Sequence, residues 1–253
     1  MPAVLRTVTA TRYVTPLREG GSLPALVEAD DDGLYVLKFR GAGQGPKALA
    51  AEIVSGELAR GVGLPVPELV LVNVDAELAR AEPDPEIQDL INASVGVNLG
   101  VDFLPGALPY TPSQPPDPEL AAAVVWLDAL IENVDRTPRN PNLLIWHGRL
   151  WLIDHGAALY LQHGADALAP LAHRPFPAIG DHVLLPHAAS IADADARLAP
   201  RLGDGRLDEV VGAVPAEWLG GEERRGDYVA YLRDRLAAPR AFAVEAEEAR
   251  ARA

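Results

Sequence analysis

Cysteine is absent from this 253-residue chain, so disulfides and thiolate metal sites are excluded. Lysine is almost absent too, because Lys38 and Lys47 are the only two against twenty arginines. No apolar run approaches the roughly eighteen residues of a membrane helix, and the first residues lack the apolar stretch of a secretory signal. We therefore expect a cytoplasmic chain without a membrane segment. The net charge of -14 argues against a nucleic-acid partner.

Hydrophobic residues make up 49% of the chain, which is enough for a core in one two-lobed domain or in two small domains. Proline gathers in one place, since six of the fourteen residues from 105 to 118 are proline. Such a stretch cannot form a regular helix or a central strand. We predict lobes at residues 1–104 and 119–253, joined by a hinge or linker at 105–118.

Three oxygen-bearing side chains fall in one short segment, at Asp135, Asn140 and Asp154. The apolar spacing of residues 119–133 predicts a helix that ends just before Asp135. Asn140 follows five residues later. Two apolar runs between Asn140 and Asp154 are predicted to pair as a hairpin, which returns Asp154 to the same place.

The types of these three side chains indicate phosphoryl transfer. Magnesium takes oxygen ligands in near-octahedral geometry, so Asn140 and Asp154 are suited to hold it while nucleotide phosphates fill other positions. Asp135 would then orient an acceptor hydroxyl and take its proton. Asp and Asn also cap helices and form turns, which is the alternative interpretation.

A lysine in the first lobe favours the chemical interpretation. Lys38 lies in the predicted strand 34–39, where a charged side chain is expected to have a partner. Because this chain otherwise uses arginine, the lysine indicates a compact point charge. Glu52, early in the predicted helix 48–60, is the candidate partner, and such a pair would hold the α- and β-phosphates of a nucleotide. The alternative is a solvated lysine on a half-exposed strand.

A glycine-rich turn precedes this strand pair. Gly20, Gly21 and Ser22 lie just before the apolar run 25–29, and glycines in a turn let backbone amides approach a phosphate. Two glycines between strands are also common in plain turns, so this signal is weak by itself.

Taken in chain order, these features resemble HipA-like kinases over roughly residues 15–160. Besides the glycine-rich turn and Glu52, the resemblance is carried by Val36-Leu37-Lys38-Phe39, Gly63-Leu64-Pro65-Val66-Pro67, the run from Asn133 to Asn140, and Ile153-Asp154-His155-Gly156. It implies an α+β, two-lobed protein-kinase-like fold with a small β-rich N-lobe and a mostly helical C-lobe. It also implies ATP and Mg²⁺ as cofactors, Asp135 as catalytic base, Asn140 and Asp154 as metal ligands, and Lys38 as the phosphate-binding lysine.

The same resemblance implies that the backbone near Asp102 and Phe103, at the end of a strand predicted within 95–104, faces adenine. The family loop usually reads close to N-x-D-R-H-x-x-N, whereas Thr137 and Pro138 follow Asp-Arg here. The turn at Asp154 reads Asp-His-Gly and not Asp-Phe-Gly. The toxin biology, antitoxin partner and tRNA-synthetase substrate of larger members are not carried over to this shorter chain.

The phosphate acceptor stays open at this point. The resemblance favours a protein serine or threonine, whereas the short, proline-broken second lobe is equally consistent with a small-molecule acceptor. A pseudokinase that uses the nucleotide pocket as an interaction module is the non-enzymatic alternative. The sequence predicts no oligomeric state.

The rest of the second lobe carries weaker signals. Four histidines, at 163, 173, 182 and 187, are candidate zinc ligands, but they lack the close spacing of a metal site and are more typical of loops. Helices are predicted at 188–202, 207–219 and 224–252, the last of them long and charged.

Overall fold

The computed structural model describes residues 5–17, 23–43, 45–160 and 169–253. The chain forms two compact units. The first contains the described residues up to Leu49 together with Pro67–Pro105, and the second contains Ala50–Val66 and the described residues from Gly106 onward. No helix among the described residues is long and apolar enough to cross a membrane.

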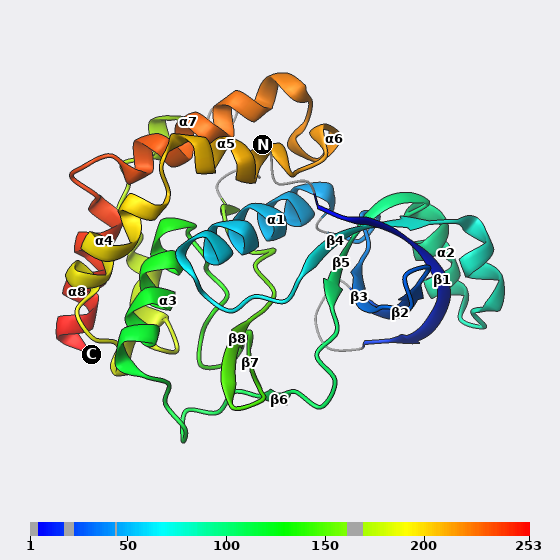
Figure 1. Ribbon diagram of the computed structural model, residues 1–253, viewed down its shortest axis with the longest axis horizontal. Helices are drawn as coiled ribbons and strands as arrows, with labels where there is room; N and C mark the ends of the chain where they lie inside the picture. Colours follow the sequence, from blue (N-terminus) through cyan, green and yellow to red (C-terminus); the bar gives the residue numbers. More distant parts are fainter. Residues whose placement is uncertain (1–4, 18–22, 44, 161–168) are drawn as a thin grey trace. The chain divides into compact units, whose positions relative to one another are not determined.

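The first unit is built on a closed five-stranded barrel in the order β1-β2-β3-β5-β4 (Figure 1). Neighbouring strands are antiparallel except β1 and β4, which run parallel and close the barrel. The strands are β1 Thr7–Pro16, β2 Ala25–Ala29, β3 Leu34–Lys38, β4 Leu69–Val74 and β5 Gly96–Asp102. Strand β1 was not predicted from the sequence.

Alternation of buried and less buried residues explains why these segments are strands. Along β2 every second residue is buried, and β3 repeats the pattern with Tyr35 and Leu37 inside. The connection from β4 to β5 carries the short helix η1 Ala76–Ala81 and helix α2 Pro85–Ala93, each begun by an aspartate that accepts from a backbone N–H. The core of the first unit is formed by buried apolar side chains from β1, β2, β3 and β4 together with those of η1 and α2.

Gly100 leaves room for two valines inside the barrel. A Cβ at this position would lie 2.6 Å from Val72 Cγ2 and 2.8 Å from Val70 Cγ2. We expect Gly100→Ala to lower the free energy of unfolding by about 1–3 kcal/mol, the usual cost of overpacking. Urea denaturation would measure this. The control is Gly43→Ala, because a Cβ there meets no atom within 4 Å; equal losses in both variants would contradict the steric explanation.

The second unit is mostly helical. It contains most of helix α1 Gly45–Val62, which begins in the first unit, and a small sheet of order β6-β7-β8. The strands are β6 Leu108–Pro109, β7 Leu143–Trp146 and β8 Arg149–Leu152. Helices α3 Pro118–Leu130, α4 Ile191–Leu198, α5 Asp204–Gly212, α6 Ala216–Leu219, α7 Arg225–Leu236 and α8 Ala241–Arg252 make up the rest, with short 3₁₀ turns between them.

Helix α3 is the centre of the second unit. Every residue from Ala121 to Leu130 is buried, and Asp117 caps the helix by accepting from two backbone N–H groups. Helices α4 and α8 both pack on α3 and on each other (Figure 1). At the other end, the buried guanidinium of Arg235 on α7 donates to the carbonyls of Leu130 and Ala129, at 2.6 and 2.7 Å. The end of α3 is thus fixed, and the loop that follows starts from a rigid point.

The long helix predicted over 224–252 is wrong, because the structure has two helices, α7 and α8. The chain leaves helical conformation at Ala237, whose φ is -69° and ψ 140°. Pro239 follows directly, and a proline inside a helix removes a backbone donor and clashes with the preceding turn. By contrast, the predicted helix at 119–133 and the hairpin before Asp154 are confirmed as α3 and as β7 and β8.

Candidate active site

The loop after α3 places Asp135 against two asparagine amides. Asp135 is half-buried, and its backbone N–H donates to Asn133 Oδ1 at 3.1 Å. Its Oδ2 accepts from Asn140 Nδ2 at 2.8 Å and from Asn142 Nδ2 at 3.3 Å. The structure therefore brings together Asp135 and Asn140, as the sequence predicts, and adds Asn142.

Thr137 and Pro138 do not open this loop. The backbone N–H of Thr137 donates to Asn140 O and the N–H of Asn140 donates to Thr137 O, each at 3.1 Å. Thr137 N–H also lies 3.0 Å from Asp135 O. These bonds close the loop on itself, and none of them needs the backbone N–H that Pro138 lacks.

Asp154 lies just after β8 with a left-handed backbone, φ 55°, and its side chain is exposed. Left-handed conformation is uncommon outside glycine, and Asp and Asn are among the residues that tolerate it best. The preceding residue, Ile153, donates its N–H to Asn142 O at 3.1 Å. The backbone oxygen of Asp154 lies 3.4 Å from Asn142 Nδ2. The hairpin thus returns Asp154 beside the loop that carries Asp135.

A buried cluster of Asp128, Asn133, Arg136 and His182 holds this loop in place. Arg136, 1% exposed, donates through Nε to Asp128 of α3 and through Nη1 to Asn142 O. Asp128 also accepts from Asn133 Nδ2 at 3.0 Å and contacts His182 Nε2 at 2.9 Å. The residues on either side of the Asp135 segment, Asn133 and Arg136, and the distal residue His182 are thereby joined to one carboxylate.

The charges in this cluster follow from its contacts. Burial would raise the pKa of Asp128, but the charge of Arg136 and the hydrogen bond from His182 outweigh burial and hold this pKa well below its usual range. Burial lowers the pKa of His182. Because Leu184 N–H donates to His182 Nδ1 at 3.1 Å, the ring is neutral and its proton lies on Nε2, facing Asp128.

His155 occupies the middle position of the Asp-His-Gly turn and is fully buried. Its Nδ1 lies 3.7 Å from Oε1 of Glu52 on α1, and neither ring nitrogen makes a hydrogen bond to a described residue. Glu52 is 2% exposed. The turn that carries Asp154 therefore lies against α1 through the polar pair of His155 and Glu52.

The remaining predicted residues belong to the first unit. Lys38 is half-buried in β3 and lies opposite Leu99 of β5. The backbone N–H of Asp102 donates to Glu68 O at 2.8 Å, and that of Phe103 donates to Leu34 O at 3.0 Å. Any contact of these two residues with adenine would therefore come from their carbonyl oxygens or side chains. Burial raises the pKa of Asp102. Gly20, Gly21 and Ser22 lie outside the described residues.

Sequence reasoning missed Asn142 and Asp128, and it interpreted His182 as a loop residue where the structure makes it a partner of Asp128. One signal was available for Asp128, because a carboxylate inside the apolar run of α3 must have a partner. The histidine cluster for zinc is not supported, since the described residues include no group of three or more His, Asp or Glu side chains placed to hold a metal. His163 lies outside the described part of the chain.

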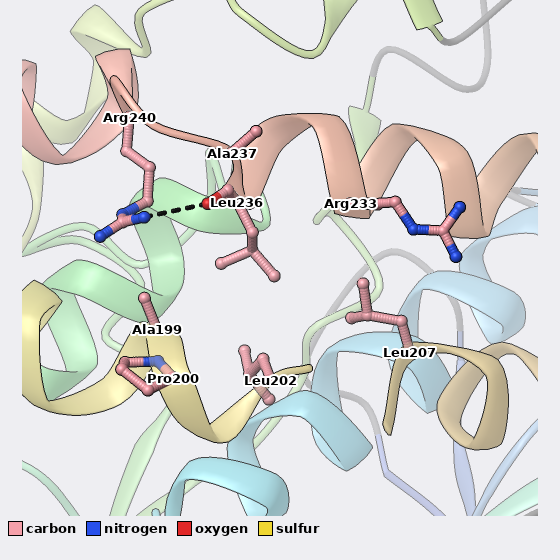
Figure 2. A pocket seen from close by; sticks show the side chains of 8 residues that line it. All are labelled: Ala199, Pro200, Leu202, Leu207, Arg233, Leu236, Ala237 and Arg240. Carbon is pink, nitrogen blue, oxygen red and sulfur yellow. Dashed lines mark hydrogen bonds between the residues drawn. The ribbon is translucent and has the colours of Figure 1, made fainter. Parts of the chain in front are cut away.

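A pocket of about 360 Å³ in the second unit contains none of the predicted site residues (Figure 2). It is lined by Ala199, Pro200, Leu202, Leu207, Arg233, Leu236, Ala237 and Arg240. The guanidinium of Arg240 donates to Asp195 at 2.7 Å and to Leu236 O at 3.0 Å. With no carboxylate in its lining, this pocket lacks the side chains that commonly hold magnesium.

A family model described as HipA-like kinase matches residues 11–237. The chain belongs to the HipA-like kinase family. Among solved structures, the Helicobacter pylori proinflammatory kinase CtkA has a TM-score of 0.58 and 13% identity, covering 100% of this chain and 98% of its own. The Golgi casein kinase with Mn/ADP bound has a TM-score of 0.51 and 12% identity, covering 98% of this chain and 73% of its own. No curated protein matches the chain.

These likenesses confirm the predicted α+β, kinase-like fold, with a β-rich N-terminal part and a helical C-terminal part. At the low identities of both solved structures, the likeness establishes the fold alone.

Proposed function

We propose that this HipA-like kinase transfers the γ-phosphate of ATP to a hydroxyl acceptor with magnesium as cofactor. One observation carries the proposal. Asp135, Asn140 and the Asp154 turn lie together, and the buried Asp128–Arg136 pair holds the loop that carries Asp135 and Asn140. The donor set fits a hard cation, because it offers carboxylate and amide oxygens and no sulfur or imidazole. The Golgi casein kinase, whose structure contains Mn/ADP, lends support from a protein of the same fold.

In the proposed mechanism each residue has a separate task. Asn140 and Asp154 would hold the metal, which when bound neutralises charge on the nucleotide phosphates. Asp135 orients the acceptor hydroxyl and takes its proton as the oxygen–phosphorus bond forms and the bond to ADP breaks. Lys38, with Glu52 as the expected partner of its ammonium group, would hold the α- and β-phosphates, and the backbone of Gly20 to Ser22 would cover them.

We propose a serine or threonine hydroxyl as the acceptor, on the family resemblance. A small-molecule alcohol is the alternative acceptor, and a pseudokinase interaction module is the alternative to catalysis. Incubating the protein with γ-labelled ATP and either a peptide library or a small-molecule alcohol library would separate these cases. Label in neither library, and none in the protein itself, would favour the module.

Nucleotide binding is testable before the acceptor is known. We expect ATP with magnesium to raise the melting temperature of the wild type, because a ligand at 100 times its Kd stabilises the folded state by about 2.7 kcal/mol. In Asp154→Ala the magnesium-dependent part of this shift should disappear, since the turn loses its carboxylate. Thermal melts with ATP, with and without magnesium, measure both effects.

The matched control for this melt is Asp208→Ala, which removes an exposed carboxylate of α5. It should keep the full magnesium-dependent shift. No shift in the wild type at millimolar ATP would defeat the proposed function, whereas an equal shift in wild type and Asp154→Ala would defeat only the assignment of the metal ligand.

A further inference from the structure

The side chain of Asn142 contacts both the loop that carries Asp135 and the turn that carries Asp154. Its Nδ2 lies 3.3 Å from Asp135 Oδ2 and 3.4 Å from the backbone oxygen of Asp154. We propose that Asn142 is a positioning residue whose side-chain amide fixes Asp135 relative to the Asp154 turn. This inference rests on the proposed phosphotransfer, and it assigns to Asn142 a task separate from that of Asn140.

The main chain of Asn142 is held from two sides. Its carbonyl oxygen accepts from Ile153 N–H at 3.1 Å and from Arg136 Nη1. Arg136 is itself bound to the buried Asp128. The side-chain amide therefore extends from a fixed point, as a positioning group must if it is to hold other residues in place.

The backbone conformation explains why an asparagine suits this position. Asn142 has φ 48°, in the left-handed region. Glycine adopts this conformation freely, and asparagine is among the few side-chain-bearing residues that tolerate it. Of these, asparagine offers a two-proton amide donor, which can reach one acceptor on each side.

Asn140 and Asn142 differ in what they contact. Asn140 is exposed and donates to Asp135 Oδ2 at 2.8 Å, whereas Asn142 is half-buried and reaches both Asp135 and Asp154. Both amides lie on Oδ2, and Oδ1 of Asp135 takes no hydrogen bond from the described residues. Oδ1 is thus left for the acceptor proton. The two contacts of Asn142 are long for hydrogen bonds, and catalytic contacts of this kind shorten in the complex with substrate.

Two substitutions separate positioning from metal binding. Asn142→Gly relieves the left-handed backbone and removes the whole side chain, including the amide. Asn142→Asp keeps the shape but replaces the donor with a carboxylate beside Asp135. If Asn142 positions Asp135, both variants lose activity, and the aspartate variant loses more because like charges then face each other. If Asn142 were a metal ligand, the aspartate variant would bind metal more tightly.

The experiment measures turnover of γ-labelled ATP into phosphoprotein or free phosphate, the KM for ATP, the affinity for Mn²⁺·ADP by calorimetry, and the melting temperature. We expect kcat of Asn142→Gly to fall about 100-fold, because a small displacement at a reacting centre costs a loss of this size. The KM and the Mn²⁺·ADP affinity should stay within about threefold, because ground-state binding is not what the amide supports. The matched control is His147→Gly, another left-handed residue with φ 49°, at the far end of β7.

Every other outcome of this experiment overturns one part of the proposal. A kcat of Asn142→Gly within about threefold of wild type overturns the positioning role. A loss shared by kcat, Mn²⁺·ADP affinity and melting temperature makes Asn142 merely structural. Tighter Mn²⁺·ADP binding with retained turnover in Asn142→Asp makes it a metal ligand. Wild type that binds Mn²⁺·ADP but turns over no ATP overturns the proposed function, and with it any catalytic positioning.

Discussion

Asp135→Asn is expected to lower phosphate transfer by about 1,000-fold while ATP binding is retained. A positioned general base contributes about 10²- to 10⁴-fold, and an amide cannot take the acceptor proton. The substitution keeps the size of the side chain. The amide oxygen of the new asparagine can take the place of Asp135 Oδ2, which now accepts from Asn140 Nδ2 at 2.8 Å. Initial rates with γ-labelled ATP, together with ATP-dependent thermal shifts, measure the two properties separately.

Asp208→Asn is the control for this prediction, because it makes the same change of charge at an exposed residue of α5. It should transfer phosphate at the wild-type rate. Transfer that survives Asp135→Asn unchanged would refute Asp135 as the base, and loss of ATP binding in this variant would show that the carboxylate acts in binding as well.

Asp128→Ala is expected to cost about 3–5 kcal/mol of the free energy of unfolding. The change leaves the guanidinium of Arg136 buried without its anion, and removing one partner of a buried pair costs this much. His182 and Asn133 lose their partner at the same carboxylate. Chemical denaturation, monitored by tryptophan fluorescence, measures the loss.

Two further variants test the cause. Adding Arg136→Met to Asp128→Ala should restore part of the stability, because the unpaired charge is then gone. Glu119→Ala, at the start of the same helix, breaks an exposed pair with Arg197 and should cost about 1 kcal/mol or less. Equal losses in Asp128→Ala and Glu119→Ala would show that burial of the pair does not decide the cost.

The local features of the fold could be predicted because they depend on short-range patterns. The apolar spacing before Asp135 predicts α3, and two apolar runs around His147-Gly148 predict the hairpin of β7 and β8. Both depend on residues within one or two turns of each other. The wrong prediction of one helix over 224–252 also has a local cause, because Pro239 stops the helix between α7 and α8.

The partners of buried polar groups could not be predicted in the same way. His182 lies 54 positions after Asp128, and the guanidinium of Arg235 caps α3 from 105 positions beyond Leu130. Nothing in the spacing of a sequence selects one distant partner over another. The parallel pairing of β1 with β4, which closes the barrel, is equally non-local.

By itself, the sequence determined which chemistry this protein has available: the acid and amide oxygens at Asp135, Asn140 and Asp154, one lysine in a strand, and no thiols. Only the tertiary structure decided how that chemistry is held, by joining Asp128, Arg136 and His182 and by placing the amide of Asn142 between two segments. The reason is physical. Residue type fixes which atoms can react, whereas the distances between them depend on packing among distant parts of the chain.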